Sequence, residues 1–202
     1  MSRRKLISLT LKGLLAWLVL SSLVWYFGEW LGKGLFPLLK AVIMTMNSEM
    51  SPSLDLVKPT AQLDYALELS VWLLRPVYLN AGQFIPPGTE LKSSAHLLHP
   101  LVPLVIELSI LLVWPVQRWS QRCLLIALGL LTAILVIMAT VPALLLGKLE
   151  ISFQDVALTG KNPRPVPWFV DWMVFCEMGG RWLLAIAAAW LCIKLQRGLM
   201  RD

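Results

Sequence analysis

Four long apolar segments constrain this chain more than any other feature of its sequence. An α-helix rises about 1.5 Å per residue, so roughly 20 apolar residues are needed to cross about 30 Å of hydrocarbon. The segments that reach or approach this length are residues 13–31, 97–116, 123–147 and 168–193. The sequence therefore predicts an α-helical membrane protein with four transmembrane helices.

The composition of the chain fits the same class. Of its residues 57% are hydrophobic and only 15% are charged, and its ten tryptophans suit the boundary between headgroups and hydrocarbon. A net charge of +6 could indicate nucleic-acid binding in a soluble protein, but here the basic residues lie beside apolar segments. We therefore expect membrane lipids, and not nucleic acid, to be the partners of these charges.

The basic residues also predict an orientation, because Lys and Arg in short flanking loops are retained on the cytoplasmic side. They gather in the N-terminus 1–12, the link 117–122 and the tail 194–202. With four spans these regions share one side, so we expect both termini in the cytoplasm and the protein in the cell's inner (plasma) membrane. The first apolar core ends in large aromatic residues, from Trp25 to Trp30, which favours an uncleaved signal anchor over a signal peptide.

The first outer connection, residues 32–96, begins with a second apolar stretch at 35–46 that follows a Gly-Lys-Gly break. We expect this stretch to extend the first helix, because Asn47 and Ser48 supply polar residues that end it. An interfacial helix is one alternative. A fifth span is another, and it would place the link 117–122 outside.

The rest of this connection carries the signature of β-strands. Apolar residues alternate at a spacing of two from Leu63 to Leu73, a period typical of a strand with one apolar face. Shorter candidate strands are 54–57, 77–79 and 89–92. In the second outer connection, residues 148–167, Leu149, Ile151 and Phe153 also alternate with polar residues. We expect strands from both connections to share one extracytoplasmic sheet, with residues 160–167 as an extended leader into the last helix.

Three charged residues inside the predicted spans are the first candidates for function, since such charges are costly. Glu107 lies in the second span, while Glu177 and Arg181 lie at an i, i+4 spacing in the fourth, which predicts one helix face. All three fall in the outer half of the membrane and could form one polar cluster. That cluster could be a structural ion-pair clamp, a partner-binding surface, or a site for an ion, a substrate or catalysis.

A thiol site is a second candidate. Cys176, His99 and Arg181 are predicted at the outer membrane boundary, where thiolate attack on a peptide would use His as the base and Arg as the oxyanion stabiliser. The alternative is that Cys176 packs as a small apolar side chain, as we expect for Cys123 and Cys192. The cysteines have no metal-binding spacing, and no phosphate-loop, dinucleotide, zinc-protease or GxSxG motif occurs, so neither metal nor cofactor is expected.

The layout resembles the small multispanning proteins associated with bacterial exosortases, which are membrane transpeptidases that process surface proteins. The shared features are a basic anchor with Trp25-Tyr26 and Pro37, an outer strand region, and His99-Pro100-Leu101 at the start of the next span. The transpeptidase nucleophile motif is absent, because Cys176 is followed by Glu-Met-Gly-Gly. The resemblance implies an accessory role in the processing of envelope proteins.

These observations predict a non-enzymatic membrane accessory protein that contacts another membrane or envelope protein in an assembly, secretion or processing machine. A membrane thiol peptidase or transpeptidase that uses Cys176 is one alternative. A small transport or channel component centred on the charged residues is the other.

Overall fold

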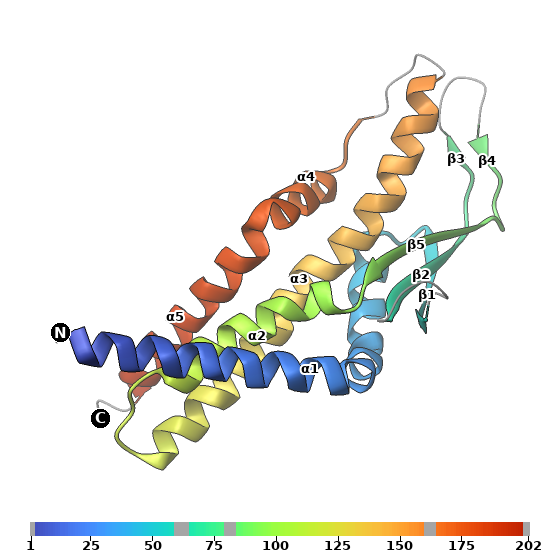
Figure 1. The fold of residues 1–202 in the computed structure, drawn as a ribbon. Coiled ribbons are helices and arrows are strands. Elements are labelled where there is room, and N and C mark those ends of the chain that lie inside the picture. Colours follow the sequence, from blue (N-terminus) through green and yellow to red (C-terminus); the bar gives the residue numbers. More distant parts are fainter. Residues whose placement is uncertain (1–2, 59–64, 79–83, 160–164, 200–202) are drawn as a thin grey trace. The chain divides into compact units, whose positions relative to one another are not determined.

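The computed structural model describes residues 3–58, 65–78, 84–159 and 165–199 (Figure 1). It is mostly helical, with a small antiparallel sheet between its first two helices. The elements are α1 (Arg3–Met46), β1 (Met50–Val57), β2 (Ala66–Leu73), β3 (Val77–Tyr78), β4 (Phe84–Ile85), β5 (Glu90–His96), α2 (Leu98–Val113), α3 (Trp119–Thr159), α4 (Trp168–Phe175), the π-helical turn η1 (Cys176–Gly180) and α5 (Arg181–Leu199).

The chain divides into two compact units. One, which we call the helical unit, comprises residues 1–28, 100–137 and 179–202. The other, the sheet unit, comprises residues 29–99 and 138–178. The first contains most of α2, all of α5 and parts of α1 and α3, whereas the second contains all the strands.

The long apolar helices make this a multi-pass membrane protein. Within the described residues, three helices are long and apolar enough to cross a bilayer: Ile7–Met46, Trp119–Asp155 and Trp168–Leu199. They contain the first, third and fourth predicted spans. The second predicted span corresponds to α2, an apolar helix of 16 residues that measures about 24 Å at 1.5 Å per residue.

Helix α1 continues to Met46, as predicted for residues 35–46. The Gly-Lys-Gly sequence does not interrupt it. A Cβ added to Gly32 would lie 2.9 Å from Leu97 Cδ1, so this glycine allows close packing inside the sheet unit. Lys33 Nζ donates to Glu29 Oε1 at 2.6 Å, an i, i+4 pair that supports the helix at the same point.

The sheet has the order β1-β2-β5, with both pairs antiparallel. The strand predicted from Leu63 is confirmed as β2 from Ala66 to Leu73, and residues 63 and 64 lie outside the described residues. Leu54, Leu69 and Ser93 align across the three strands on the buried face. The opposite face is polar, and on it Lys92 Nζ pairs with Glu68 Oε1 at 3.0 Å.

The other short strands agree in part with the prediction. Residues 54–57 belong to the longer strand β1, and residues 90–92 begin β5. The segment predicted at 77–79 forms β3, which pairs with β4 in a separate two-stranded hairpin; Leu79 lies outside the described residues. This hairpin is part of the connection between β2 and β5, so all the strands among the described residues come from residues 32–96.

The strand predicted in the second outer connection is wrong. Residues 148–159 continue α3, which ends at Thr159 instead of Gly147. The buried apolar residues are Leu149, Phe153 and Ala157, a spacing of four; Glu150 is also buried, whereas Ile151 is exposed. The alternation over five residues is therefore also compatible with one face of a helix. Of the predicted leader, residues 160–164 lie outside the described residues, and 165–167 have no regular secondary structure, with Pro167 extended before α4.

The last predicted span is also interrupted. The sequence Cys176–Gly180 forms a π-helical turn between α4 and α5, and Gly179 has φ of 109°. Residues with a Cβ rarely adopt this conformation, so glycine is the residue that permits the kink. A Cβ at Gly179 would meet no atom within 4 Å, which shows that backbone conformation and not space selects glycine here.

Candidate functional site

Glu107 is the most distinctive polar residue of the helical unit. It lies on α2 and has no exposed surface. Its Oε1 accepts a hydrogen bond from Thr132 Oγ1 on α3, and Cys192 Sγ on α5 lies 3.8 Å from the same oxygen. Its Oε2 is buried and has no hydrogen-bond partner among the described residues. One carboxyl group thus meets three helices in their common interior.

The surrounding sequence explains how these helices approach one another. Leu111, one turn after Glu107, packs in a core with Leu125 and Ala189. Gly129 lies opposite Leu111, and a Cβ on Gly129 would collide with the Leu111 side chain. The glycine therefore lets α2 approach α3 closely, which brings Thr132, one turn further along α3, to the carboxyl group.

The hydrogen bonding around Glu107 is under-satisfied. Thr132 has a single hydroxyl proton, yet its Oγ1 lies within reach of Glu107 Oε1 and 2.9 Å from the carbonyl oxygen of Leu128. It also lies 3.1 Å from Cys192 Sγ. A buried polar oxygen without a partner costs free energy, so the arrangement is not the most stable one for this position. Its chemistry suits a site that exchanges a proton or contacts a polar group of a ligand.

The clustering of Glu107, Glu177 and Arg181 stays a prediction. Glu177 and Arg181 were expected on one helix face, but Glu177 is exposed and Arg181 is buried, at 8% exposure. The π-helical turn and Gly179 lie between them, so the i, i+4 rule of a regular α-helix does not apply. Glu107 and Arg181 belong to the helical unit and Glu177 to the sheet unit.

The sequence alone did not identify the residues that contact Glu107, because their amino-acid types are ordinary for an apolar helix. Threonine and cysteine are common in apolar helices, where they pack or bond to the backbone. Only the approach of α3 and α5 to α2 identifies Thr132 and Cys192 as neighbours of Glu107. A search for small residues one turn from a glycine, as Thr132 is from Gly129, could have suggested the first of them.

The thiol candidate lies in the sheet unit. Cys176 is only 3% exposed, and the rings of His96 and His99 lie 6.5 Å apart, edge to face. A reactive thiol needs access and a polar, electropositive environment, whereas buried cysteines are usually inert. The burial of Cys176 therefore favours packing. Among the described residues no group of three His, Cys, Asp or Glu side chains could hold a metal ion.

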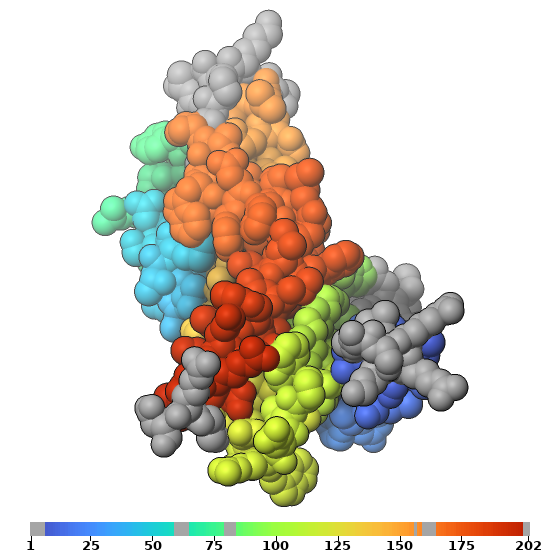
Figure 2. Space-filling model, turned by 90° about the vertical axis from the view of Figure 1, so that its left-hand side faces the viewer, coloured from blue at the N-terminus to red at the C-terminus, as the bar shows by residue number. Residues whose placement is uncertain are grey.

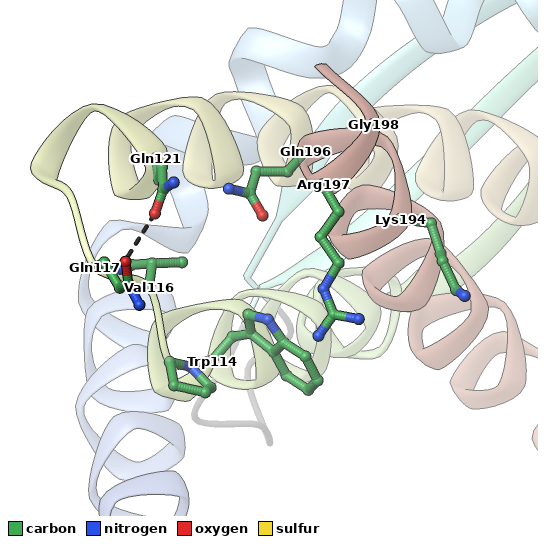
Figure 3. Close-up of a pocket in the computed structure, with 9 residues that line it drawn as sticks. Trp114, Val116, Gln117, Gln121, Lys194, Gln196, Arg197 and Gly198 are labelled. Atoms are coloured by element: carbon green, nitrogen blue, oxygen red, sulfur yellow. Dashed lines mark hydrogen bonds between the residues drawn. The ribbon is translucent and has the colours of Figure 1, made fainter. Parts of the chain in front are cut away.

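A hollow of about 550 Å³ lies at the end of the helical unit where α2 and α5 end and α3 begins (Figure 3). It is lined by Trp114, Pro115, Val116, Gln117, Gln121, Lys194, Gln196, Arg197 and Gly198. We call it the basic hollow, because two of these nine described residues are cationic and none is acidic. The same end of α5 lies against the link after α2 in the space-filling view (Figure 2).

The sheet unit presents a different surface. Its β3–β4 hairpin exposes Tyr78 and Phe84, at 70% and 56%, with ring centroids 6.0 Å apart. Trp72 and Leu74, at the end of β2 that leads into the hairpin, are also exposed. We call these four residues the aromatic patch. Exposed large apolar side chains such as the paired rings of Tyr78 and Phe84 are typical of a contact surface.

Comparison with protein-family models, with curated proteins and with solved structures finds no match for this chain.

Proposed function

We propose that this chain is a non-enzymatic accessory protein of the bacterial inner membrane, with four spans and both termini in the cytoplasm. Its extracytoplasmic sheet would present the aromatic patch to another membrane or envelope protein. That partner would belong to an assembly, secretion or surface-protein processing machine. The observation that carries the proposal is the exposure of the paired rings of Tyr78 and Phe84 on the β3–β4 hairpin.

The packing of the helical unit supports the orientation. The basic hollow combines the link after α2 with the end of α5. A second group of residues brings the beginning of α1, with Leu9 and Gly13, to the end of α2, with Trp114 and Pro115. Three basic regions thus meet at one end of one compact unit, the arrangement that the positive-inside rule favours if α2 crosses the membrane.

The length of α2 is compatible with a span. Its 16 helical residues fall short of about 30 Å, but Trp114, Pro115 and Val116 continue the apolar sequence beyond its end. Local thinning of the bilayer accommodates a mismatch of a few ångströms at modest cost. A crossing by α2 would put the sheet on the side opposite the link 117–122.

The polar face of the sheet supports an aqueous location for it. Lys92 pairs with Glu68 and approaches Glu90 at 3.8 Å, and all three lie on the face away from the core. On that background the aromatic patch is a local exception. Tyrosine, tryptophan and phenylalanine are enriched at the centres of protein interfaces, where they contribute large contact areas with few rotatable bonds.

A quantitative pull-down tests this proposal. The tagged protein is expressed at native level, extracted in mild detergent, and its co-purifying chains are identified and counted. We expect one envelope protein at a fixed ratio, reduced at least tenfold by the double substitution Tyr78→Ser and Phe84→Ser. Ser53→Thr on the polar sheet face is the matched control and should retain the partner. A chain that purifies alone, or a partner equally retained by both variants, would contradict the proposal.

The buried carboxyl group favours one competing function. A fully buried glutamate with an unpartnered oxygen, next to a hydroxyl and a thiol, is a group that a proton-linked transporter could use. Proton-dependent flux in reconstituted vesicles that is lost in Glu107→Gln would support this alternative. The thiol-peptidase alternative has less support, because Cys176 is buried; full function of Cys176→Ala would dismiss it.

A further inference from the structure

The basic hollow adjoins a second hollow that is almost entirely apolar. The second hollow measures about 590 Å³ and is formed by the beginning of α1 and the last two turns of α2. Its lining includes Leu9, Trp17, Ile106 and Val113. Trp114 and Pro115 line both hollows, so a polar compartment and an apolar compartment share a wall within the helical unit.

From this juxtaposition we propose that the helical unit binds one anionic phospholipid, with its phosphate in the basic hollow and an acyl chain in the apolar hollow. The volumes are of the size that small-molecule sites in proteins commonly have, roughly 300–1,000 Å³. The division into a cationic part and an apolar part matches the two ends of a phospholipid.

Arg197 is the residue best placed to hold the phosphate. Its guanidinium lies 5.2 Å from the centre of the Trp114 ring, and Figure 3 shows the side chain directed toward that ring. Stacking on an aromatic face restricts the guanidinium while its N–H groups remain free to donate in a fork to phosphate oxygens. Lys194, at the rim, adds a second positive charge.

A buried amide faces the same space. Gln196 is 5% exposed and lines the basic hollow, and Figure 3 places its side chain between Gln121 and Arg197. An amide supplies both donors and acceptors, which suits the hydroxyl and phosphate oxygens of a headgroup such as glycerol phosphate. Gln121 is already engaged, because its Oε1 accepts hydrogen bonds from the backbone N–H groups of Gln117 and Arg118.

Another cation near the basic hollow, Arg122, has a structural task. Arg122 Nη1 donates to the carbonyl oxygens of Leu111 and Leu112, each at 2.8 Å. These bonds satisfy free carbonyl groups at the end of α2 and fix the position of Trp114 just beyond it. The positive charge of Arg122 remains at this end of the unit and adds to the attraction for an anion.

Lipid retention by the purified full-length chain tests the proposal. Native mass spectrometry in neutral detergent compares phosphatidylglycerol with phosphatidylcholine of identical acyl chains. We expect the wild-type protein to retain the anionic lipid at least about fivefold better, the factor that one basic residue near an anionic lipid contributes. Arg197→Gln should remove most of this preference, whereas Lys92→Gln, which removes the same charge from the sheet unit, should leave it unchanged.

Two further measurements distinguish binding of a lipid from binding of a free phosphate compound. Gly13→Leu, which fills the apolar hollow, should weaken retention of both lipids, and soluble glycerol phosphate at millimolar concentration should not displace the phosphatidylglycerol. Equal retention of the two lipids by the wild-type protein would overturn the proposal, even if Arg197→Gln fails to fold. Full displacement by glycerol phosphate would also overturn it.

Discussion

The helical unit and the β1-β2-β5 sheet of the sheet unit place their polar and apolar residues in opposite ways. In the sheet the inward-facing side chains of β2, such as Leu69 and Val71, are buried, and charged residues such as Glu68 and Lys92 lie on the outer face. In the helical unit leucines such as Leu131 and Leu135 are exposed, while Glu107 and Gln196 are buried. The difference indicates two solvents, hydrocarbon around most of the helical unit and water around the outer face of the sheet.

The strongest test of this comparison is truncation of an apolar side chain in each unit. Leu69→Ala, at the centre of the sheet, should lower the free energy of unfolding by about 2–5 kcal/mol because it leaves a cavity. Leu135→Ala, on an exposed helical surface, should change it by less than about 0.5 kcal/mol. Equilibrium unfolding in detergent micelles measures both. Equal losses would mean that burial does not distinguish the two surfaces.

The next largest effect is expected at the contact between α2 and α3. Gly129→Ala places a Cβ against Leu111 and should destabilise the protein by about 1–3 kcal/mol through overpacking. Gly34→Ala is the matched control: no atom lies within 4 Å of the added Cβ, so better helix propensity should stabilise it by up to about 1 kcal/mol. Thermal unfolding followed by circular dichroism gives the sign of each change. A neutral Gly129→Ala would contradict close packing here.

Glu107 tests whether the interior of the helical unit is optimised for stability. Glu107→Leu removes an under-satisfied carboxyl group and should leave the unfolding free energy unchanged or raise it by about 1 kcal/mol. A loss above about 3 kcal/mol would show that the carboxyl group stabilises the packing of α2, α3 and α5. Glu107→Gln, measured in parallel, keeps the shape and separates the effect of charge from that of packing.

The smallest effect is expected from the Lys92–Glu68 ion pair on the polar face of the sheet. The hydrogen bond and charge of Glu68 raise the pKa of Lys92 above its ordinary value. A raised lysine pKa stabilises the folded state below the unfolded-state pKa, and this contribution is lost as the pH rises through the higher folded-state value. Melting temperatures of the wild-type protein and Lys92→Met should therefore differ slightly at neutral pH and converge at strongly alkaline pH. A difference that grows with alkaline pH would contradict this sign.

The sequence predicted the long apolar helices and the strand β2 because both have long, consistent hydrophobic patterns. It failed at residues 149–153, where five residues are too few to separate a spacing of two from a spacing of four. It did not reveal the π-helical turn at Cys176–Gly180, where Gly179 departs from the regular geometry that the i, i+4 rule assumes. A short sequence pattern does not reveal an isolated π-helical turn or a single residue with positive φ.

The candidate sites were less predictable than the fold. Glu107 was identified because a charge in an apolar helix is rare, but its partners Thr132 and Cys192 lie on other helices and have ordinary types for a membrane segment. The basic hollow likewise combines residues about 80 positions apart, from Trp114 to Lys194 and Arg197. Their proximity depends on how α2, α3 and α5 pack, which no short sequence window records.

The most direct test of the proposed topology asks whether α2 crosses the membrane. In a background with the exposed Cys123 replaced by serine, Ser53→Cys on the sheet and Gln117→Cys after α2 are labelled in spheroplasts with a membrane-impermeant maleimide. If α2 crosses the membrane, Ser53→Cys reacts in intact spheroplasts and Gln117→Cys reacts only after permeabilisation. Labelling of both positions on the same side would contradict it.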